Sequence, residues 1–167
     1  KGSVDRIYKS FCDGIYRVNG SAHMKNLIRD TMGELFSIEI DNDTKPLRVG
    51  IVGEIYTSID QYANFDIFSK LGNMGVEVDR KVTVSGWIID HIIKNALHLP
   101  RDLRYVEASK PYLGTMIGGH AQETIGHSVL YANDGYDGII QIYPLTCMPE
   151  IVAESLLASV EEDHNIP

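Results

Sequence analysis

One cysteine stands in a setting that suits chemistry. Cys147 lies between Pro144 and Pro149, after a short apolar run and before a stretch with helical periodicity. The prolines restrict the backbone, and the positive end of the following helix would stabilise a thiolate. Such a thiolate could ligate a metal or act as a nucleophile, although a lone cysteine is more often a small buried hydrophobic residue. For the adjacent Glu150 we favour a structural role, complementing the helix dipole.

Two further candidate sites lie at the end of a predicted strand and at the start of a predicted helix. Glu54 falls at the carboxyl end of an apolar run, where a carboxylate could act as an acid or base or orient a ligand, with a plain surface position as the alternative. Gly118 and Gly119 precede a helical pattern, and glycines there permit close approach of a phosphate or cofactor to free N–H groups. A simple turn is the other reading of this pair. Asn64 is expected to be a helix cap.

A histidine and acidic set looks less suited to chemistry. His120, Glu123 and His127 share one face of a helix with 100° between residues. The two histidines are separated by roughly 10.5 Å of helical rise, too far to chelate one ion directly. Since small and apolar residues occupy the other side of this helix, we expect the three polar residues to form a solvated stripe.

These candidates need a scaffold, and the hydrophobic pattern predicts one. The first forty residues have the spacing of two amphipathic helices, and the polar residues 41–46 form a boundary. Beyond it, β-branched runs alternate with helical patterns. Strands are expected at 47–55, 76–84 and 139–143, and helices at 64–71, 85–97, 119–133 and from 150 onward, while 101–119 is ambiguous.

This alternation predicts an α/β fold with a doubly wound, mainly parallel sheet of Rossmann-like (flavodoxin-like) type. We expect an N-terminal helical segment over residues 1–45 and the α/β domain over 46–167. Open α/β folds bind ligands at the carboxyl ends of their strands. The loops expected to meet there are 53–57, 83–87 and 144–150.

Composition excludes several classes of protein. The 15 Lys and Arg against 23 Asp and Glu give a net charge of −8, the wrong sign for nucleic-acid binding. No apolar run approaches the roughly 20 residues of a membrane span, so we expect a cytoplasmic protein. Cys12 and Cys147 are the two cysteines, too few to hold an iron–sulfur cluster alone. Because Pro167 falls where a further strand would begin, we expect a domain of a longer protein.

Several stretches together resemble one family. The chain from about residue 47 onward is similar to the acyl-CoA dehydratase activase-related proteins and to the cluster-bearing subunits of 2-hydroxyacyl-CoA dehydratases. The loop Cys147-Met-Pro-Glu150 is the most specific part, and Leu145-Thr146 departs from the Phe-Gly or similar pair usual before this cysteine. The stretches that carry the resemblance are 48–56, 62–66, 85–87, 117–126, 136–140 and 144–150.

The resemblance implies a cofactor and partners. In dehydratase subunits a cysteine of the corresponding loop helps to hold a [4Fe–4S] cluster near the acyl-CoA site, and an ATP-dependent activase supplies one electron for dehydration. Carried over, Cys147 is the matched metal ligand, and its co-ligands would come from outside this chain. Glu54, and Gly118 with Gly119, are the weaker candidates for catalysis and for the cofactor-binding face. Cys12 matches no ligand.

Three functional hypotheses follow. The leading one is a cluster-ligating domain of a dehydratase-like or activase-related iron–sulfur protein, lyase-like as a whole and inactive as this fragment alone. The second is a non-catalytic electron-transfer or partner-docking module that binds an activase ATPase. The third, hydrolysis by a cysteine nucleophile, ranks last because no histidine is assigned to a neighbouring loop at a strand end.

Overall fold

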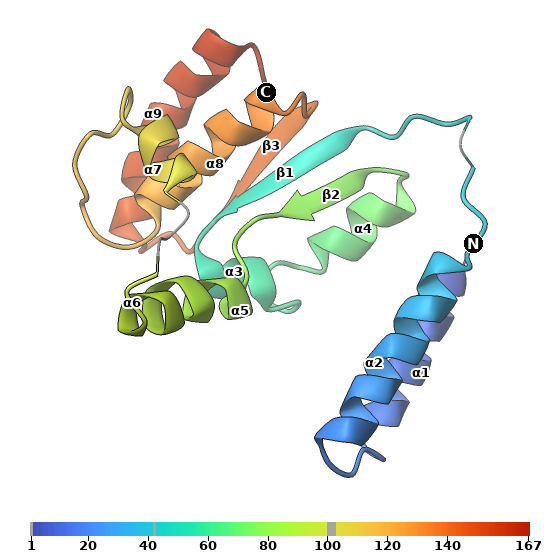
Figure 1. Ribbon diagram of the computed structural model, residues 1–167. Coiled ribbons are helices and arrows are strands. Elements are labelled where there is room, and N and C mark those ends of the chain that lie inside the picture. Colours follow the sequence, from blue (N-terminus) through green and yellow to red (C-terminus); the bar gives the residue numbers. More distant parts are fainter. Residues whose placement is uncertain (1, 42, 100–102) are drawn as a thin grey trace. The chain divides into compact units, whose positions relative to one another are not determined.

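The computed structural model describes residues 2–41, 43–99 and 103–167, and the chain forms two compact units (Figure 1). The first unit comprises Lys1–Lys45 and the second Pro46–Pro167. Among the helices of the described ranges, none combines the length and apolarity needed to cross a membrane.

The first unit is a helical hairpin. Helix α1 (Ser3–Ile15) and helix α2 (Ser21–Phe36) pack along each other, joined by a turn in which Gly20 has a φ of 86°. A Cβ at Gly14 would lie 2.8 Å from Leu27 Cδ1, so the two helices approach closely there. Both helices follow the spacing read from the sequence.

The second unit is built on a parallel sheet. Strand β1 (Arg48–Gly53) lies between β2 (Glu77–Arg80) and β3 (Gly138–Ile142), and within the described residues these make a three-stranded sheet. In register, Arg48 pairs with Glu77 on one side of β1, and Gly53 pairs with Ile142 on the other. The prediction of an α/β fold with a parallel sheet is confirmed at this level. Strands β1 and β2 are shorter than expected, and β3 has the expected length but begins one residue earlier.

Two short helices connect β1 to β2. Helix α3 (Ile55–Ile59) starts directly after the strand, because the Glu54 carboxylate accepts hydrogen bonds from the first backbone N–H groups. Helix α4 (Ile67–Asn73) packs on β2. The prediction that Asn64 caps this helix is wrong. Asp66 precedes α4, and Asn64 is buried with its Nδ2 donating to the Ser58 carbonyl.

A run of consecutive helices follows β2. It consists of α5 (Val84–Ile88), the π-helical turn η1 (Ile89–Ile93) and α6 (Lys94–Ala96). Thr83 rather than Ser85 is the cap, since its hydroxyl accepts from the Gly86 N–H at 3.1 Å. Of Val84, Trp87, Asp90, His91 and Asn95 only the backbone is described.

Three helices form the main core of the second unit. They are α7 (Arg104–Ser109), α8 (Ala121–Asn133) and α9 (Met148–His164). Helix α8 packs on β1, α7 and α9, and α7 resolves the first part of the ambiguous segment. The buried cluster between the helices consists of Ala121, Ile125, Val129, Ala153 and Val160.

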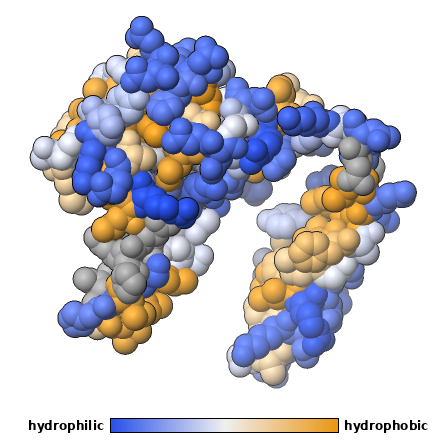
Figure 2. Space-filling view, turned by 45° about the horizontal axis from the view of Figure 1, so that its top comes forward, coloured by the Kyte–Doolittle hydropathy of each residue, from blue (hydrophilic) through white to orange (hydrophobic). Residues whose placement is uncertain are grey.

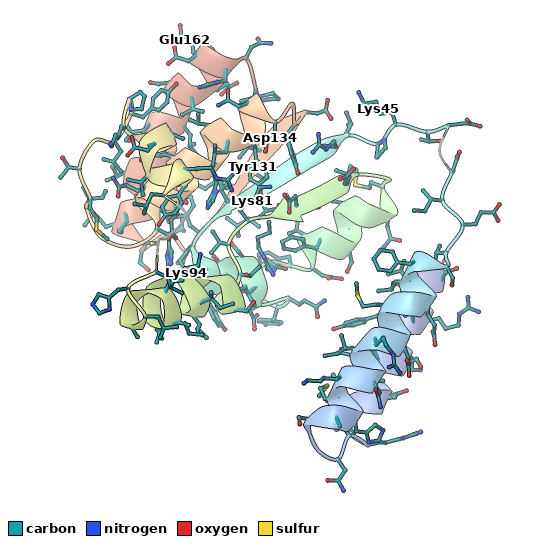
Figure 3. All side chains as sticks on the ribbon, in the orientation of Figure 1. Lys45, Lys81, Lys94, Tyr131, Asp134 and Glu162 are labelled. Atoms are coloured by element: carbon teal, nitrogen blue, oxygen red, sulfur yellow. The ribbon has the colours of Figure 1, made fainter. Side chains whose placement is uncertain are left out.

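Tyr131 joins helix α8 to the sheet (Figure 3). It is fully buried, and a Cβ at Gly50 would lie 2.7 Å from its Cε2, so the glycine makes room for the ring. The hydroxyl accepts a hydrogen bond from the Lys81 backbone N–H at 2.9 Å, and burial raises the pKa of Tyr131. This contact fixes the chain just beyond the carboxyl end of β2.

Candidate functional site

The order of the strands identifies the edge of the sheet where a site is expected. From β1 the chain passes to β2 on one side and then returns past β1 to β3 on the other. Right-handed connections therefore put α4 and α8 on opposite faces. In open α/β folds ligands bind at the carboxyl ends of the strands near such a reversal, which here are the ends of β1 and β3.

The backbone holds these two strand ends tightly together. The Glu54 N–H donates to the Ile142 carbonyl at 2.9 Å. Gly53, with a φ of 122°, has no room for a side chain, because its Cβ would lie 2.8 Å from the Ile142 carbonyl carbon. The loops that begin at Glu54 and Tyr143 therefore leave the sheet from one point.

Cys147 occupies the N-cap position of the long helix α9. Its N–H donates to the Pro144 carbonyl at 2.9 Å, and its carbonyl accepts from the Ile151 N–H at 3.0 Å. The thiol is partly exposed, with no side-chain capping hydrogen bond, and the neighbouring Leu145 and Met148 are exposed. The prediction that Cys147 precedes a helix N-terminus is confirmed, with the helix starting at Met148 rather than Glu150.

The glycine pair lies against the loop that carries Cys147. Gly118 and Gly119 have φ values of 87° and 57°, which favour glycine. A Cβ at Gly119 would lie 2.8 Å from Pro149 Cγ, whereas one at Gly118 would meet nothing within 4 Å. The structure thus brings the 118–119 turn and the 144–150 loop together.

Glu150 lies beneath this contact rather than at the surface. It is completely buried, and its carboxylate accepts hydrogen bonds from the Thr124 hydroxyl and from Gln141 Nε2, each at 2.9 Å. Burial raises the pKa of Glu150, although these two hydrogen bonds oppose the shift. The carboxylate ties α8, β3 and α9 together, a larger role than the helix-dipole contribution predicted from the sequence.

Glu54 is engaged as a helix cap. Its Oε1 accepts from the Tyr56 N–H at 3.0 Å and its Oε2 from the Thr57 N–H at 2.9 Å. Partial burial acts to raise the pKa of Glu54, but these N–H groups, the Thr57 hydroxyl and the nearby His120 outweigh it and lower the pKa. Glu54 therefore favours the ionised form. Its predicted catalytic role stays a prediction.

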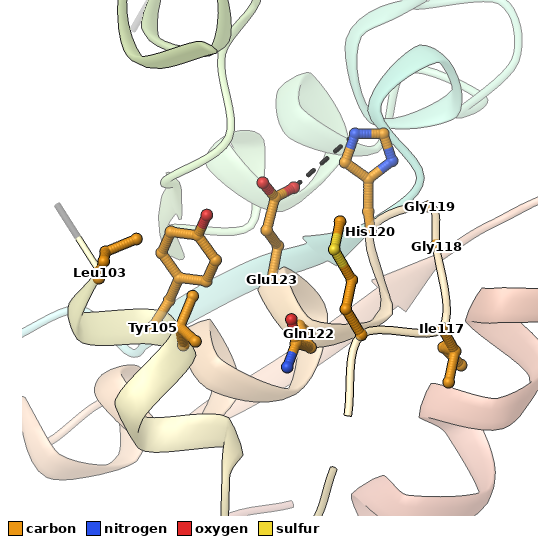
Figure 4. A pocket seen from close by; sticks show the side chains of 10 residues that line it. Leu103, Tyr105, Ile117, Gly118, Gly119, His120, Gln122 and Glu123 are labelled. Carbon is orange, nitrogen blue, oxygen red and sulfur yellow. Dashed lines mark ion pairs between the residues drawn. The ribbon is translucent and has the colours of Figure 1, made fainter. Parts of the chain in front are cut away.

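A cavity opens beside the glycine turn (Figure 4). It has a volume of about 540 Å³, within the range of small-molecule pockets, and its wall is mostly apolar. His120 and Glu123 lie in its wall, with Nε2 and Oε2 3.7 Å apart. The wall also includes Tyr105, Met116, Ile117 and the two glycines.

The prediction of a solvated stripe on this helix is wrong. The side chains of His120 and Glu123 are only 21% and 14% exposed. His127 is partly buried, with its ring centroid 5.2 Å from that of Tyr105. Helix α7 packs against α8 on this side, and it comes from the segment whose structure the sequence left ambiguous.

Two residues of the buried network were not predicted. Thr124 and Gln141 look like an ordinary helix and strand residue, but they hold Glu150. The sequence signal for a buried polar network is the pair Thr124 and Ser128 on the apolar side of α8, because buried hydroxyl groups need hydrogen-bond partners.

Cys12 belongs to the helical hairpin, and the side chain of Trp87 lies outside the described residues. Throughout the described ranges, no group of three or more His, Cys, Asp and Glu side chains is arranged to hold a metal ion. The second unit contributes one thiol, which is insufficient for a [4Fe–4S] cluster.

Comparisons with known proteins give no relative. A scan against protein-family models, a search of curated proteins and a search of solved structures each found no match to this chain.

Proposed function

We propose that this chain is a Rossmann-like domain of an iron–sulfur protein related to the 2-hydroxyacyl-CoA dehydratases and the activase-related proteins. In this proposal Cys147 supplies one thiolate ligand to a [4Fe–4S] cluster, and the other ligands come from outside these 167 residues. The observation that carries the proposal is the position of Cys147, as the partly exposed N-cap of α9 beside the carboxyl edge of the sheet.

The surroundings of Cys147 are suited to a single external ligand. Pro144 and Pro149 restrict the loop, as does the hydrogen bond that the Cys147 N–H donates to the Pro144 carbonyl. The backbone position of Cys147 is therefore fixed. Metals bind cysteine as the thiolate. A thiol at the surface of the unit, rather than in its core, is also accessible to a cluster shared with another segment or subunit.

The adjacent cavity is where we place an acyl-CoA substrate. Its apolar wall fits an acyl chain, and Gly118, where a Cβ would meet nothing within 4 Å, allows a ligand to approach the backbone closely. His120 and Glu123 would hold or move a proton at the polar part of the cavity. The cluster, when bound, supplies low-potential electrons, while these residues bind the substrate and exclude water. The proposal places the protein in the cytoplasm.

Cluster binding can be tested with the protein's own second cysteine as the control. Anaerobic reconstitution with iron and sulfide would be performed on the complete protein that contains this chain, as Cys147→Ser, as Cys12→Ser and without substitution. We expect Cys147→Ser to lose iron and the visible absorption of the cluster, and Cys12→Ser to retain both. Unchanged iron content and spectrum in Cys147→Ser would remove Cys147 as a ligand.

An apolar surface favours docking of an ATP-dependent activase as a second candidate function. The helices α5, η1 and α6, which follow the carboxyl end of β2, expose several large aliphatic side chains (Figure 2). Exposed apolar patches of this kind mark interaction sites. These residues are Ile88, Ile89, Ile92, Ile93 and, directly after α6, Leu97.

The docking hypothesis has its own test. Ile92→Glu should weaken binding of an activase ATPase by about tenfold or more, because it puts a charge into an apolar contact. Met74→Glu, at a more exposed position after α4, is the control and should have no effect. Equal binding by both variants would exclude this surface.

A further inference from the structure

The helical hairpin has an apolar groove along one side. Its volume is about 260 Å³, and residues from both helices line it. On α1 these include Val4, Ile7 and Tyr8, and on α2 they include Ile28 and Met32. The space-filling view shows apolar side chains on the surface of this hairpin (Figure 2).

The hairpin buries little of its own apolar surface. Of its described residues, Ile7 alone is a buried hydrophobic residue. A polypeptide of about 40 residues rarely forms a sufficient core unless metals, disulfides or association with another chain support it. Helices of this length also depend mainly on packing of their apolar faces. A stable hairpin therefore requires a cover for the groove.

The spacing of the groove residues specifies helices as the cover. The groove residues recur along each helix at intervals of three and four. On α1 they are Val4, Ile7, Tyr8 and Phe11, and on α2 they are Ile28, Thr31, Met32 and Leu35. Such rows are the seams of four-helix bundles, which pack helices at about 20°. Two antiparallel helices provide half of such a bundle.

The exposed area matches what a dimer needs. Four large groove residues are about half exposed, namely Val4 (57%), Tyr8 (58%), Ile28 (46%) and Met32 (44%). At on the order of 100 Å² for each of these, with smaller parts of Phe11 and Leu35, the groove offers roughly 500 Å² of apolar surface. Since an interface core is about 65% apolar, this corresponds to about 800 Å² per partner, the standard size.

We propose that the α1–α2 hairpin is a dimerisation element, which pairs groove to groove with the hairpin of a second copy of this chain to form a four-helix bundle. The inference is independent of the function proposed for Cys147. An isologous pairing uses the same surface on both copies, so it needs no other partner.

The mass of the 167-residue chain in solution provides the first test. Light scattering and sedimentation at about 50 µM should give twice the chain mass of 18.6 kDa. Met32→Glu and Tyr8→Glu should each weaken dimerisation at least tenfold, because the charge enters the interface from both copies. Asn26→Glu adds the same charge at an exposed position on the other side of α2 and should leave the dimer intact.

Hydrogen exchange of the unsubstituted chain tests the location without relying on variants. On dilution through the dissociation constant, amide protection should fall in α1 and α2 and stay constant in β1. A monomer at 50 µM would overturn the proposal, whether or not the hairpin is protected. A dimer whose dilution-dependent protection lies in α5, η1 and α6 would also overturn it, since another surface would then form the contact.

Discussion

Glu150 shows at the scale of one residue how the site is held in place. Its buried carboxylate depends on donors from two other elements, Thr124 on α8 and Gln141 on β3. The carbonyl of Glu150 also accepts from Gln141 Nε2, at 3.0 Å. The N-terminal turn of α9, and with it Cys147, is positioned by these bonds.

Removing one donor should therefore destabilise the α/β unit. Thr124→Val keeps the side-chain shape but deprives the buried carboxylate of a hydroxyl, so we expect the free energy of unfolding to fall by about 1–3 kcal/mol. Urea denaturation monitored by circular dichroism measures this. Thr115→Val, at an exposed position in the loop before α8, is the control and should change stability little. Equal stability of the two variants would contradict the role assigned to the network.

The same residue shows what sequence reasoning at a single position misses. Glu150 was expected to act at a helix N-terminus, and it does lie in the first turn of α9. Its complete burial depends on Gln141 and Thr124, which lie 9 and 26 positions away along the chain. The residues around Glu150 in the sequence do not indicate these partners. Cys147 was placed correctly because its setting, a strand end, two prolines and a helix start, is local.

At the scale of elements, helix α8 is fitted to its neighbours by a glycine. A Cβ at Gly126 would lie 2.6 Å from the Tyr105 carbonyl carbon, so α7 crosses α8 in direct backbone contact. Tyr105 also lines the cavity beside His120. The position of α7 on α8 consequently shapes one wall of the proposed substrate pocket.

Substitution of this glycine should separate the two helices. We expect Gly126→Ala to lower the free energy of unfolding by about 3 kcal/mol, because backbone atoms cannot move aside as a flexible side chain can. Gly72→Ala in α4 meets nothing within 4 Å and should raise stability by about 0.5–1 kcal/mol through helix propensity. Thermal and chemical denaturation of both variants give the comparison. A neutral Gly126→Ala would refute the close α7–α8 contact.

Elements were predictable where their pattern was strong. The three strands, α1, α2, α8 and α9 follow from the spacing of apolar residues, with errors of a few residues at their ends. Helix α3 was missed because Glu54 acts as a cap through its long side chain, directly after a strand. The face of α8 bearing His120 was predicted to be solvated because the cover, α7, comes from the ambiguous segment.

At the scale of the whole α/β unit, the pKa values of three carboxyl groups are shifted in opposite directions by the fold. Desolvation opposes ionisation of Glu54 and Asp79, but hydrogen bonds and nearby charges outweigh it and lower the pKa of both. Burial instead raises the pKa of Glu150. Stability is thus affected by protonation at two ends of the pH range, for opposite reasons.

The free energy of unfolding should fall both at acid pH (the acid limb) and as the pH rises toward neutral. One substitution, Glu150→Gln, should remove the second decline and leave the first. Glu54 and Asp79 stabilise the fold above the unfolded carboxyl pKa of about 4, and this stability is lost as the pH falls through their lowered folded values. The contribution of Glu150 is complete below that unfolded pKa and is lost as the pH rises through its raised folded value. Glu150→Gln cannot ionise, so its free energy of unfolding should lack the decline toward neutral pH seen with the unsubstituted chain while keeping the acid limb. Denaturation measured from well below the unfolded carboxyl pKa of about 4 up to about pH 8 covers both limbs. Parallel curves for the two proteins would show that Glu150 does not titrate differently on folding.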